Sequence, residues 1–228
     1  MIKTFLIGGA VRDSLLGIES QDKDFAVEAP SFAAMENHIR SMGGEIFLSK
    51  PEFLTIRARV PNLGAADFVL CRKDGPSSDG RRPDSVTAGT IFDDLARRDF
   101  TMNAIAQDVE TGTLIDPHGG ENDIYMKVIR CVGNPAARFN EDKLRVFRAL
   151  RFALTKKFLI EQDTNAAIHK FAAEDFGGVS TERIRDELFK MFAANSQGAA
   201  MAIFMGFPQL GKLVLSRGIW FEPTTRKP

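Results

Sequence analysis

Short apolar runs alternate with longer amphipathic runs along the first part of the chain, and glycines mark several of the boundaries between them. The apolar runs have the length and composition of buried strands, whereas the amphipathic runs repeat at helical spacing. Ser31 stands where an N-cap is expected, and Gly43 stands where the helix after it would end. The pattern predicts strands over 4–8, 23–29, 45–49, 54–60 and 66–72, and helices over 10–17, ending at Gly17, and 31–43.

Polar and apolar residues alternate strictly along 54–60, which predicts a strand with one polar and one buried face. The polar face would carry Thr55, Arg57 and Arg59, and the buried face Ile56, Ala58 and Val60. The segment 73–89 has no such periodicity and is rich in Gly, Pro, Ser and Asp, which predicts a long, functional loop. After it we predict a helix over 91–106 and a final pair of short strands over 112–117 and 127–133.

The character of the sequence changes near Asn140, where the strand-like runs give way to one helical run after another. We therefore predict an α+β domain over 1–138 and an all-helical domain over 139–228. The helices of the second domain are predicted over 141–157, 162–173, 180–194 and about 197–206.

Composition restricts the class of protein. Hydrophobic residues make up 44% and charged residues 26% of the 228 residues, as in globular proteins, and no apolar stretch approaches a membrane span. Cys71 and Cys131 lack a CxxC partner, so we interpret them as small buried hydrophobic residues in a reducing compartment, by default the cytoplasm. The 30 basic and 30 acidic residues cancel, so binding to a polyanion would require locally clustered basic groups.

Three aspartates are candidate metal ligands. Asp22 and Asp24 flank Lys23 on a predicted strand, so their side chains would share one face about 7 Å apart. Mg²⁺ prefers such carboxylate oxygens, although an isolated Asp-x-Asp is more often a solvated strand face. Asp67, on a later and otherwise apolar strand, changes that balance. Three carboxylates from two neighbouring strands would form a two-metal site for phosphoryl transfer.

Two glycines suggest a phosphate site beside these carboxylates. Gly8 and Gly9 follow a predicted strand and open a helix, where bare backbone N–H groups favour an anion. Arg12, one turn into the helix, could add a bidentate contact. The alternative is an ordinary tight turn between strand and helix. Together with the carboxylates, a phosphate cradle is the arrangement that nucleotidyl transfer requires.

At this point the chain resembles a known family, the class II tRNA nucleotidyltransferases and bacterial poly(A) polymerases of the polymerase β-like superfamily. Five motifs that cover about residues 4–195 carry the resemblance in the family's order. They are GGAVRDSLLG…DKDF (8–25), RRDFTMNAIA (97–106), IDPHGG…D (115–123), EDKLRVFRALRFA (141–153) and TERIRDEL (181–188). The resemblance implies an α+β head, with a small mixed sheet flanked by helices, followed by a helical neck.

The resemblance also implies a role for each matching residue. Asp22 and Asp24 match the metal-binding pair, and Asp67 matches the carboxylate that completes the catalytic set. Arg98 and Asp99 match positions that contact the phosphates and ribose of the incoming nucleotide, and Asn103 matches a supporting position. The other matches to nucleotide-binding positions are Gly8, Gly9, Arg12, Asp142, Arg145, Arg148 and Arg151.

The chemistry of the Asp142 and Arg145 side chains agrees with a role in base recognition. On the predicted helix 141–157 they would be neighbours at i and i+3, and would offer one acceptor beside a fork of donors. Cytosine and adenine present an amino group beside ring acceptors, whereas uracil and guanine present a carbonyl instead. The pair could therefore select C and A without a nucleic-acid template. The alternative is a surface salt bridge; the apolar residues Leu144, Phe147, Leu150 and Leu154 on the facing side of the helix make it less attractive.

The sequence departs from the family in two places. Lys143 stands where the family usually has proline, and the chain stops where the helical body and tail that grip tRNA would follow. We expect that a partner or a homo-oligomer could compensate for them.

The leading hypothesis is a Mg²⁺-dependent enzyme that adds C and A from CTP and ATP to the 3′ end of tRNA or a tRNA-like RNA. A poly(A) polymerase or a partial-CCA enzyme is the alternative within the class, although the loop DGRRPDSV (79–86) favours full CCA addition. An inactive nucleotide- or RNA-binding module is the alternative from another class.

Overall fold

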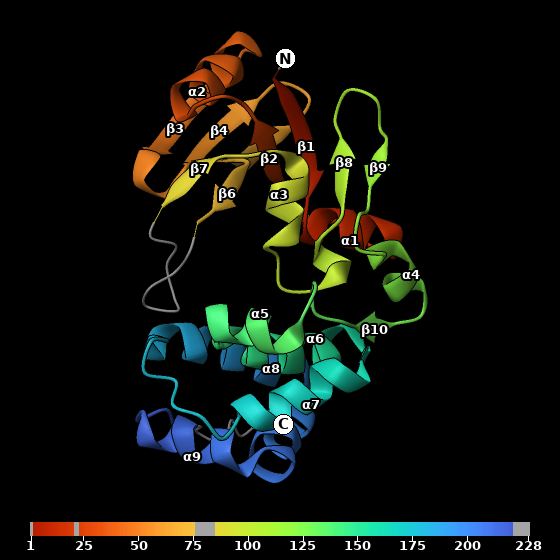
Figure 1. Ribbon diagram of the computed structural model, residues 1–228, viewed down its shortest axis with the longest axis vertical. Coiled ribbons are helices and arrows are strands. Elements are labelled where there is room, and N and C mark those ends of the chain that lie inside the picture. Colours follow the sequence, from red (N-terminus) through yellow and green to blue (C-terminus); the bar gives the residue numbers. More distant parts are fainter. Residues whose placement is uncertain (1, 21–22, 76–84, 221–228) are drawn as a thin grey trace, which may run out of the picture. The chain divides into compact units, whose positions relative to one another are not determined.

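The computed structural model describes residues 2–20, 23–75 and 85–220 of the chain (Figure 1). The chain divides into two compact units, residues 1–134 and residues 135–228. The first unit contains a mixed sheet with helices on both faces, and the second consists almost entirely of helices. The predicted α+β class with a helical C-terminal region is therefore confirmed.

A seven-stranded sheet in the order β3-β4-β5-β2-β1-β8-β9 forms the frame of the first unit. Its strands β2 and β5 pair in parallel, whereas β1 pairs antiparallel with both β2 and β8. The strands of this sheet are β1 (Lys3–Ile7), β2 (Asp24–Glu28), β3 (Glu45–Lys50), β4 (Thr55–Val60), β5 (Gly64–Leu70), β8 (Ala106–Asp108) and β9 (Leu114–Ile115).

Short helices and a small ribbon complete the first unit. The helices are α1 (Gly9–Leu15), α2 (Phe32–Ser41), α3 (Ile91–Ala96) and α4 (Gly120–Tyr125), with the 3₁₀ turns η1 (Pro51–Phe53) and η2 (Thr101–Asn103). Strands β6 (Arg72–Asp74) and β7 (Val86–Ala88) pair with each other, and β10 spans Val128–Ile129.

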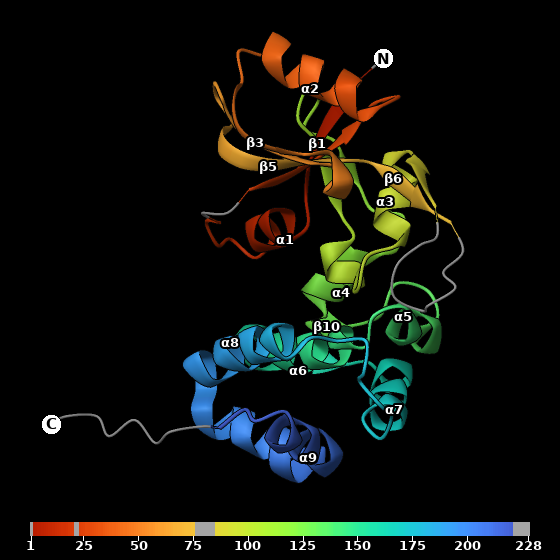
Figure 2. The ribbon, with the colours of Figure 1, turned by 90° about the vertical axis from the view of Figure 1, so that its left-hand side faces the viewer.

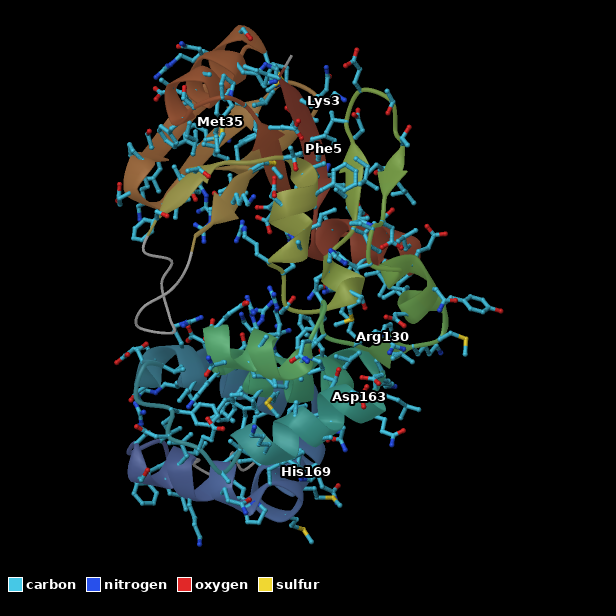
Figure 3. All side chains as sticks on the ribbon, viewed as in Figure 1. Lys3, Phe5, Met35, Arg130, Asp163 and His169 are labelled. Atoms are coloured by element: carbon cyan, nitrogen blue, oxygen red, sulfur yellow. The ribbon has the colours of Figure 1, made fainter. Side chains whose placement is uncertain are left out.

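Each face of the sheet has its own hydrophobic core. Figure 2 shows α2 on one side of the sheet and α3 on the other. Beneath α2, Met35 packs against a cluster that includes Phe25 and Phe68, whose rings stack with centroids 5.1 Å apart. On the opposite face, Phe5 belongs to a cluster that contains Ile91 and Leu95 of α3. Phe5 and Met35 are labelled in Figure 3. Since alternate residues of a strand face opposite sides, one strand contributes to both cores.

The strand predictions are confirmed, including the strict alternation of β4, whose Ile56, Ala58 and Val60 are buried. Ser31 caps α2 by accepting a hydrogen bond from the backbone N–H of Ala34 at 3.1 Å. Cys71 and Cys131 are buried free thiols, as predicted, and burial raises the pKa of the Cys71 thiol.

The predicted helix over 91–106 is wrong, because α3 ends at Ala96 and the chain continues through η2 into β8. The carboxylate of Asp99 accepts a hydrogen bond from the N–H of Phe100, and Phe100 pairs with Cys131 in an isolated bridge. These non-helical hydrogen bonds replace the i→i−4 bonds that a continuous helix would need. Parts of the predicted loop 73–89 lie in β6 and β7, and residues 76–84 lie outside the described residues.

The second unit contains α5 (Pro135–Glu141), α6 (Leu144–Lys156), α7 (Gln162–Phe171), α8 (Thr181–Ala200), the π-helical segment η3 (Met201–Gly206) and α9 (Pro208–Ser216), with β11 at Leu159–Ile160. Phe147 of α6 is fully buried and meets Phe176 edge-on, with centroids 5.7 Å apart. The predicted break between 194 and 197 is present as a kink at Asn195, whose φ and ψ are −157° and 92°.

Among the described residues, no single helix is long and apolar enough to cross a membrane. One pair of helices, Thr181–Gly206 and Pro208–Ser216, is long and apolar enough only when the two are taken together, and they are bent by 103° relative to each other.

We expect Phe68→Ala to lower the free energy of unfolding by about 3–5 kcal/mol, since the ring is fully buried and its removal leaves a cavity beside Phe25. Urea unfolding monitored by circular dichroism would measure the loss. Phe53→Ala, which removes a ring that is 60% exposed on η1, is the matched control and should change stability by less than about 1 kcal/mol. Equal losses in both variants would contradict the assignment of Phe68 to the core.

Candidate active site

The register of the sheet places charged side chains in one row across three strands. Asp24 of β2 lies opposite Asp67 of the parallel strand β5, and Asp67 lies opposite Arg57 of β4. Residues opposite one another on paired strands project to the same face. Arg57 holds Asp67 with a two-pronged ion pair, in which Nε donates to Oδ1 at 2.7 Å and Nη2 to Oδ2 at 2.8 Å. No local sequence pattern indicates this ion pair.

A hollow of about 500 Å³ opens over this row, and its lining includes the predicted metal ligands Asp24 and Asp67. Adjacent strands run about 4.8 Å apart. Carboxylates on two such strands suit a hard divalent cation such as Mg²⁺. Asp22, the third predicted ligand, lies outside the described residues. Within the described ranges, no group of three or more His, Cys, Asp or Glu side chains is arranged to hold a metal ion. The lining residues are Lys23, Asp24, Phe47, Arg57, Ala65, Ala66 and Asp67.

The glycine turn lies next to this row, because Ile7 at the end of β1 is opposite Asp24. Gly8 has φ +66° and ψ −126°, a conformation that only glycine adopts without strain. A Cβ atom at Gly8 would also lie 3.0 Å from Nη1 of Arg98. A glycine at position 8 therefore lets the backbone pass close to Arg98 and turn into α1, which begins at Gly9.

The predicted nucleotide contacts of the first unit form one hydrogen-bonded group. Nη1 of Arg12 donates to Oδ1 of Asn103 at 2.6 Å, and Nδ2 of Asn103 donates to Oδ1 of Asp99 at 3.1 Å. Nη1 of Arg98 donates to the backbone carbonyl of Asn103 at 3.3 Å. Arg12, Asp99 and Asn103 are all buried. The structure thus brings Gly8, Gly9, Arg12, Arg98, Asp99 and Asn103 together, as the order of the motifs alone could not show.

Asp94, which the sequence analysis missed, anchors Arg98 of this group and the neighbouring Arg97. Its carboxylate is fully buried and pairs with both Arg97 and Arg98, with Nη2 of Arg98 at 2.9 Å. Burial alone would raise the pKa of Asp94, but the guanidinium groups of Arg98 and Arg97 outweigh it and lower that pKa below its usual value. The spacing of Asp94 and Arg98, i and i+4 on a helix, was the available signal.

The motif at 115–123 supports η2. Both carboxylate oxygens of Asp116 accept backbone hydrogen bonds at the start of α4, from Gly120 at 2.8 Å and Glu121 at 2.9 Å. A Cβ at Gly120 would lie 2.1 Å from the carbonyl oxygen of Thr101, so only glycine permits this approach. Asp123, in turn, accepts a hydrogen bond from the Thr101 hydroxyl at 2.7 Å.

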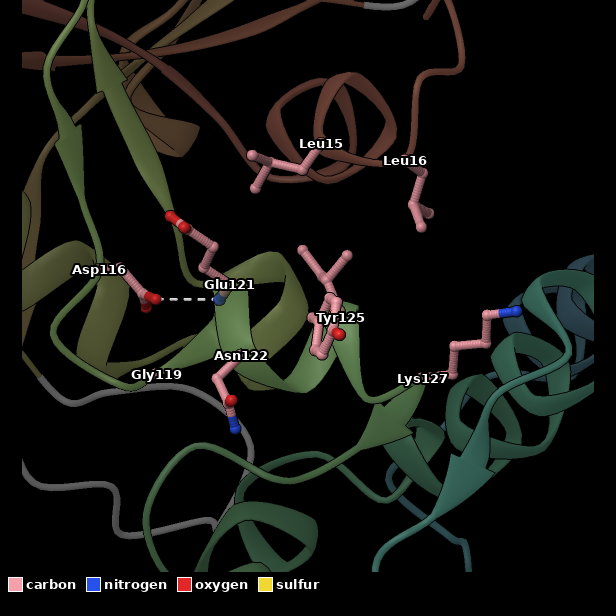
Figure 4. A pocket seen from close by; sticks show the side chains of 9 residues that line it. Leu15, Leu16, Asp116, Gly119, Glu121, Asn122, Tyr125 and Lys127 are labelled. Atoms are coloured by element: carbon pink, nitrogen blue, oxygen red, sulfur yellow. Dashed lines mark hydrogen bonds between the residues drawn. The ribbon is translucent and has the colours of Figure 1, made fainter.

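A second hollow, of about 800 Å³, lies between α1 and α4, and Figure 4 shows Leu15, Leu16, Asp116 and Tyr125 around it. None of the predicted catalytic or nucleotide-binding residues lines it. The hollow over Asp24 and Asp67 is smaller but is lined by two of the predicted metal ligands, so we take it as the candidate active site.

In the second unit, the placement of Asp142 on the predicted helix 141–157 is wrong. Asp142 lies between α5 and α6 rather than on a helix, because its Oδ1 accepts the N–H of Leu144 at 3.0 Å and starts α6 there. Its Oδ2 binds Arg183 of α8 at 2.7 Å. Arg145 donates instead to Glu141 and to the carbonyl of Arg138, each at 2.8 Å.

The arginines further along α6 share a buried carboxylate that the sequence analysis missed. Glu187 of α8 is 5% exposed and pairs with Arg151 and, at 3.6 Å, with Arg148. Both guanidinium groups also lie over the ring of Phe152. Glu187 therefore holds two of the four predicted nucleotide-binding residues of the second unit.

Comparison with known proteins agrees with this architecture. Residues 4–130 match the family described as "Poly A polymerase head domain", and residues 157–203 match "Probable RNA and SrmB- binding site of polymerase A". The CCA-adding enzyme of Geobacillus thermodenitrificans is 38% identical over 208 residues, which are 88% of this chain and 48% of that protein.

Solved structures give the same result. The CCA-adding enzyme of Bacillus stearothermophilus in complex with CTP matches with a TM-score of 0.73 and 32% identity, over 96% of this chain and 49% of that one. A tRNA nucleotidyltransferase complexed with a primer tRNA and an incoming ATP analog matches with a TM-score of 0.67 and 29% identity, over 96% and 58%. The chain spans about half the length of the curated relatives it matches.

The sheet, its flanking helices and the matched head domain define a nucleotidyltransferase head. The chain belongs to the family of poly(A) polymerases and tRNA nucleotidyltransferases.

We expect Asp94→Asn to lower the free energy of unfolding at neutral pH by about 2–4 kcal/mol, because it leaves two guanidinium groups without their buried counter-charge. The folded-state pKa of Asp94 is lowered, so its contribution is present above the unfolded-state pKa of about 3.9 and is lost as the pH falls through the folded-state value. The difference between wild type and variant should therefore shrink in acid. Urea unfolding over a pH series measures it, and a difference that stays constant down to low pH would contradict the ion-pair role.

Proposed function

We propose that the chain carries the catalytic and base-selecting part of a Mg²⁺-dependent, template-independent nucleotidyltransferase that adds C and A from CTP and ATP to the 3′ end of tRNA. The observation that carries the proposal is the row in which Asp24 and Asp67 lie side by side, next to the glycine turn with Arg12 and Arg98. Relatives solved with CTP, and with a primer tRNA and an ATP analog, support it. The two buried free thiols support a reducing compartment, for which we propose the cytoplasm.

The chemistry is an in-line displacement at the α-phosphorus of the nucleoside triphosphate. The 3′ oxygen of the RNA forms a bond to that phosphorus, the bond to the bridging oxygen breaks, pyrophosphate leaves, and the hydroxyl proton passes to water. Arg12 and Arg98 hold the phosphates, and their own partners Asn103 and Asp94 fix where the guanidinium groups point. Asp22, Asp24 and Asp67 would hold Mg²⁺, which would lower the pKa of the attacking hydroxyl and neutralise charge on the leaving group.

Base selection is assigned to the second unit. Asp142 offers an acceptor whose position is set by Leu144 and Arg183, and Arg145 offers donors whose position is set by Glu141. Neither side chain depends on the other for its orientation, so each can address a different atom of the base edge. Arg148 and Arg151, fixed by Glu187, complete the set of nucleotide-binding residues.

The alternatives remain those that the sequence left open. A poly(A) polymerase, or an enzyme that adds only CC or only A, would use the same residues. The match of 4–130 to a family named for poly(A) polymerase favours keeping this alternative. An inactive nucleotide- or RNA-binding module would lack one of the three carboxylates or a member of the set formed by Asp142 and Arg145. Incubation with tRNAs ending at each stage of CCA and with each labelled nucleoside triphosphate singly distinguishes these functions.

We expect Asp24→Ala to abolish nucleotide incorporation while the melting temperature stays unchanged or rises, because the side chain is exposed and its removal relieves repulsion between carboxylates. Incorporation of labelled CTP into tRNA and thermal melting measure the two effects. Glu110→Ala, in the exposed turn after β8, is the control and should retain full activity. Loss of folding in Asp24→Ala would show instead a structural role.

Asp142→Ala should reduce the discrimination of CTP and ATP against UTP and GTP by about 1–3 kcal/mol, by analogy with a bidentate base contact. The variant should also lose about 0.5–2 kcal/mol of stability, because the side chain accepts the Leu144 N–H as a cap would. Single-nucleotide incorporation at a temperature well below the melting point separates the two effects. An unchanged preference among the four triphosphates would refute base selection by Asp142.

A further inference from the structure

The order of the strands gives the candidate active site two distinct sides. The carboxylates lie on β5 and β2, in the middle of the sheet, while the glycine turn and its arginines follow β1 on one side. On the other side of the carboxylates lie β4 and the edge strand β3. In an in-line displacement the attacking and leaving oxygens are on opposite sides of the phosphorus. If the triphosphate is held on the β1 side, the RNA 3′ end must approach from the β3–β4 side.

The β3–β4 side has an aromatic residue that the proposed function does not use. Phe47 lines the hollow together with Asp24, Asp67 and Arg57, yet its side chain is 50% exposed. A half-exposed ring at a reactive site is unusual, because burial in the core would stabilise it more. Such a ring suits a base, which has an apolar π-face of similar size.

Phe47 lies at a β-bulge, on the face of the sheet that carries the hollow. On β3, Ile46 pairs with Ala58 and Leu48 pairs with Arg57, so Phe47 is an extra residue without a register partner on β4. Ile46 packs into the core beneath α2, so alternation along the strand turns Phe47 to the opposite face, and the bulge leaves it there without a neighbour on β4 in register. Bulges change the direction of a side chain and are frequent beside active sites.

Cations accompany the ring. The guanidinium group of Arg59 lies 5.6 Å from the centroid of the Phe47 ring, and Arg59 is opposite Ala65, another residue of the hollow. Lys23 also lines the hollow. An aromatic ring with arginine and lysine beside it is the combination by which proteins hold single-stranded nucleic acid, the ring for a base and the cations for phosphates.

We propose that Phe47 and Arg59 form the docking platform for the 3′-terminal nucleotide of the RNA, with the base stacked on Phe47 and its phosphate beside Arg59. The platform is a positioning device: it holds the RNA end on the side of Asp67 from which the 3′ hydroxyl attacks. This inference rests on the proposed function for the direction of attack, and on the bulge and the hollow for the residues.

The test measures RNA binding and nucleotide binding separately, on the whole chain. The RNA probe is a short hairpin with a single-stranded 3′ tail ending in 2-aminopurine, whose fluorescence is quenched on stacking. The nucleotide probe is CTP, titrated without RNA. Phe47→Ala and Phe47→Leu should weaken RNA binding by about 5- to 100-fold and abolish the quenching, with CTP affinity unchanged. Phe47→Tyr, which keeps the ring, should bind as the wild type does.

Matched controls separate the platform from general surface effects. Phe53→Ala removes an exposed ring at the same edge of the sheet, 60% exposed and not lining the hollow, and should leave RNA affinity unchanged. Arg59→Ala should reduce the slope of log affinity against log salt by about 0.7, the value for one phosphate contact on a single strand. Arg40→Ala, on α2 at the opposite face of the sheet, should not change it.

Each contrary result would overturn the inference. Wild-type RNA affinity and quenching in Phe47→Ala would show that the ring holds no base. A loss of CTP affinity with unchanged RNA affinity would assign Phe47 to the incoming nucleotide instead. Because the binding measurements need no turnover, they decide the role of Phe47 even if the wild-type chain incorporates no nucleotide, a result that would count against the proposed function alone.

Discussion

The parallel pairing of β2 with β5 is the constraint on which the site depends. It sets Asp24 directly opposite Asp67, although the two residues are separated by α2 and the two strands β3 and β4. A parallel pair requires a long crossover, and here α2 and the β3–β4 hairpin form it. A shift by one residue would turn Asp67 to the face that α2 covers, where Phe25 and Phe68 now stack. The same register therefore maintains the hydrophobic core and places the two candidate metal-binding carboxylates together.

A second constraint is the chain of buried polar contacts that positions the arginines at the glycine turn. Arg12 is held by Asn103 and Arg98 by Asp94, and the carbonyl of Asn103 also accepts from Arg98. η2, which carries Asn103, is in turn supported by the close approach of Gly120. Motifs far apart in the sequence thus act on one another through η2. A buried polar network of this kind is stabilising only when each member is satisfied, so a change at one position is felt at the others.

Local patterns predicted most of the fold, because alternation and helix caps depend on neighbouring residues. β4 and the N-cap Ser31 illustrate this. The errors occur where distant residues outcompete local preference. The helix predicted over 91–106 ends at Ala96 because Phe100 bridges to Cys131. Asp142, predicted on one helix with Arg145, lies before that helix and is held by a partner 41 residues further on, Arg183. Strand register also decides the Arg57–Asp67 pair, and no local pattern encodes it.

Two candidate site carboxylates, one in each unit, have one property in common. Asp67 is held by Arg57 in the first unit, and Asp142 is held by Arg183 in the second. Each carboxylate therefore already has a guanidinium partner. A ligand that binds the carboxylate oxygens must displace that arginine, so that one partner is exchanged for another. Exchange reduces the gain from binding, but it keeps the carboxylate oriented and compensated before the ligand arrives. Such an exchange favours ligands that offer a better partner than a guanidinium group, and discriminates against those that do not. Under the proposed function these ligands are a divalent cation at Asp67 and a matching base edge at Asp142.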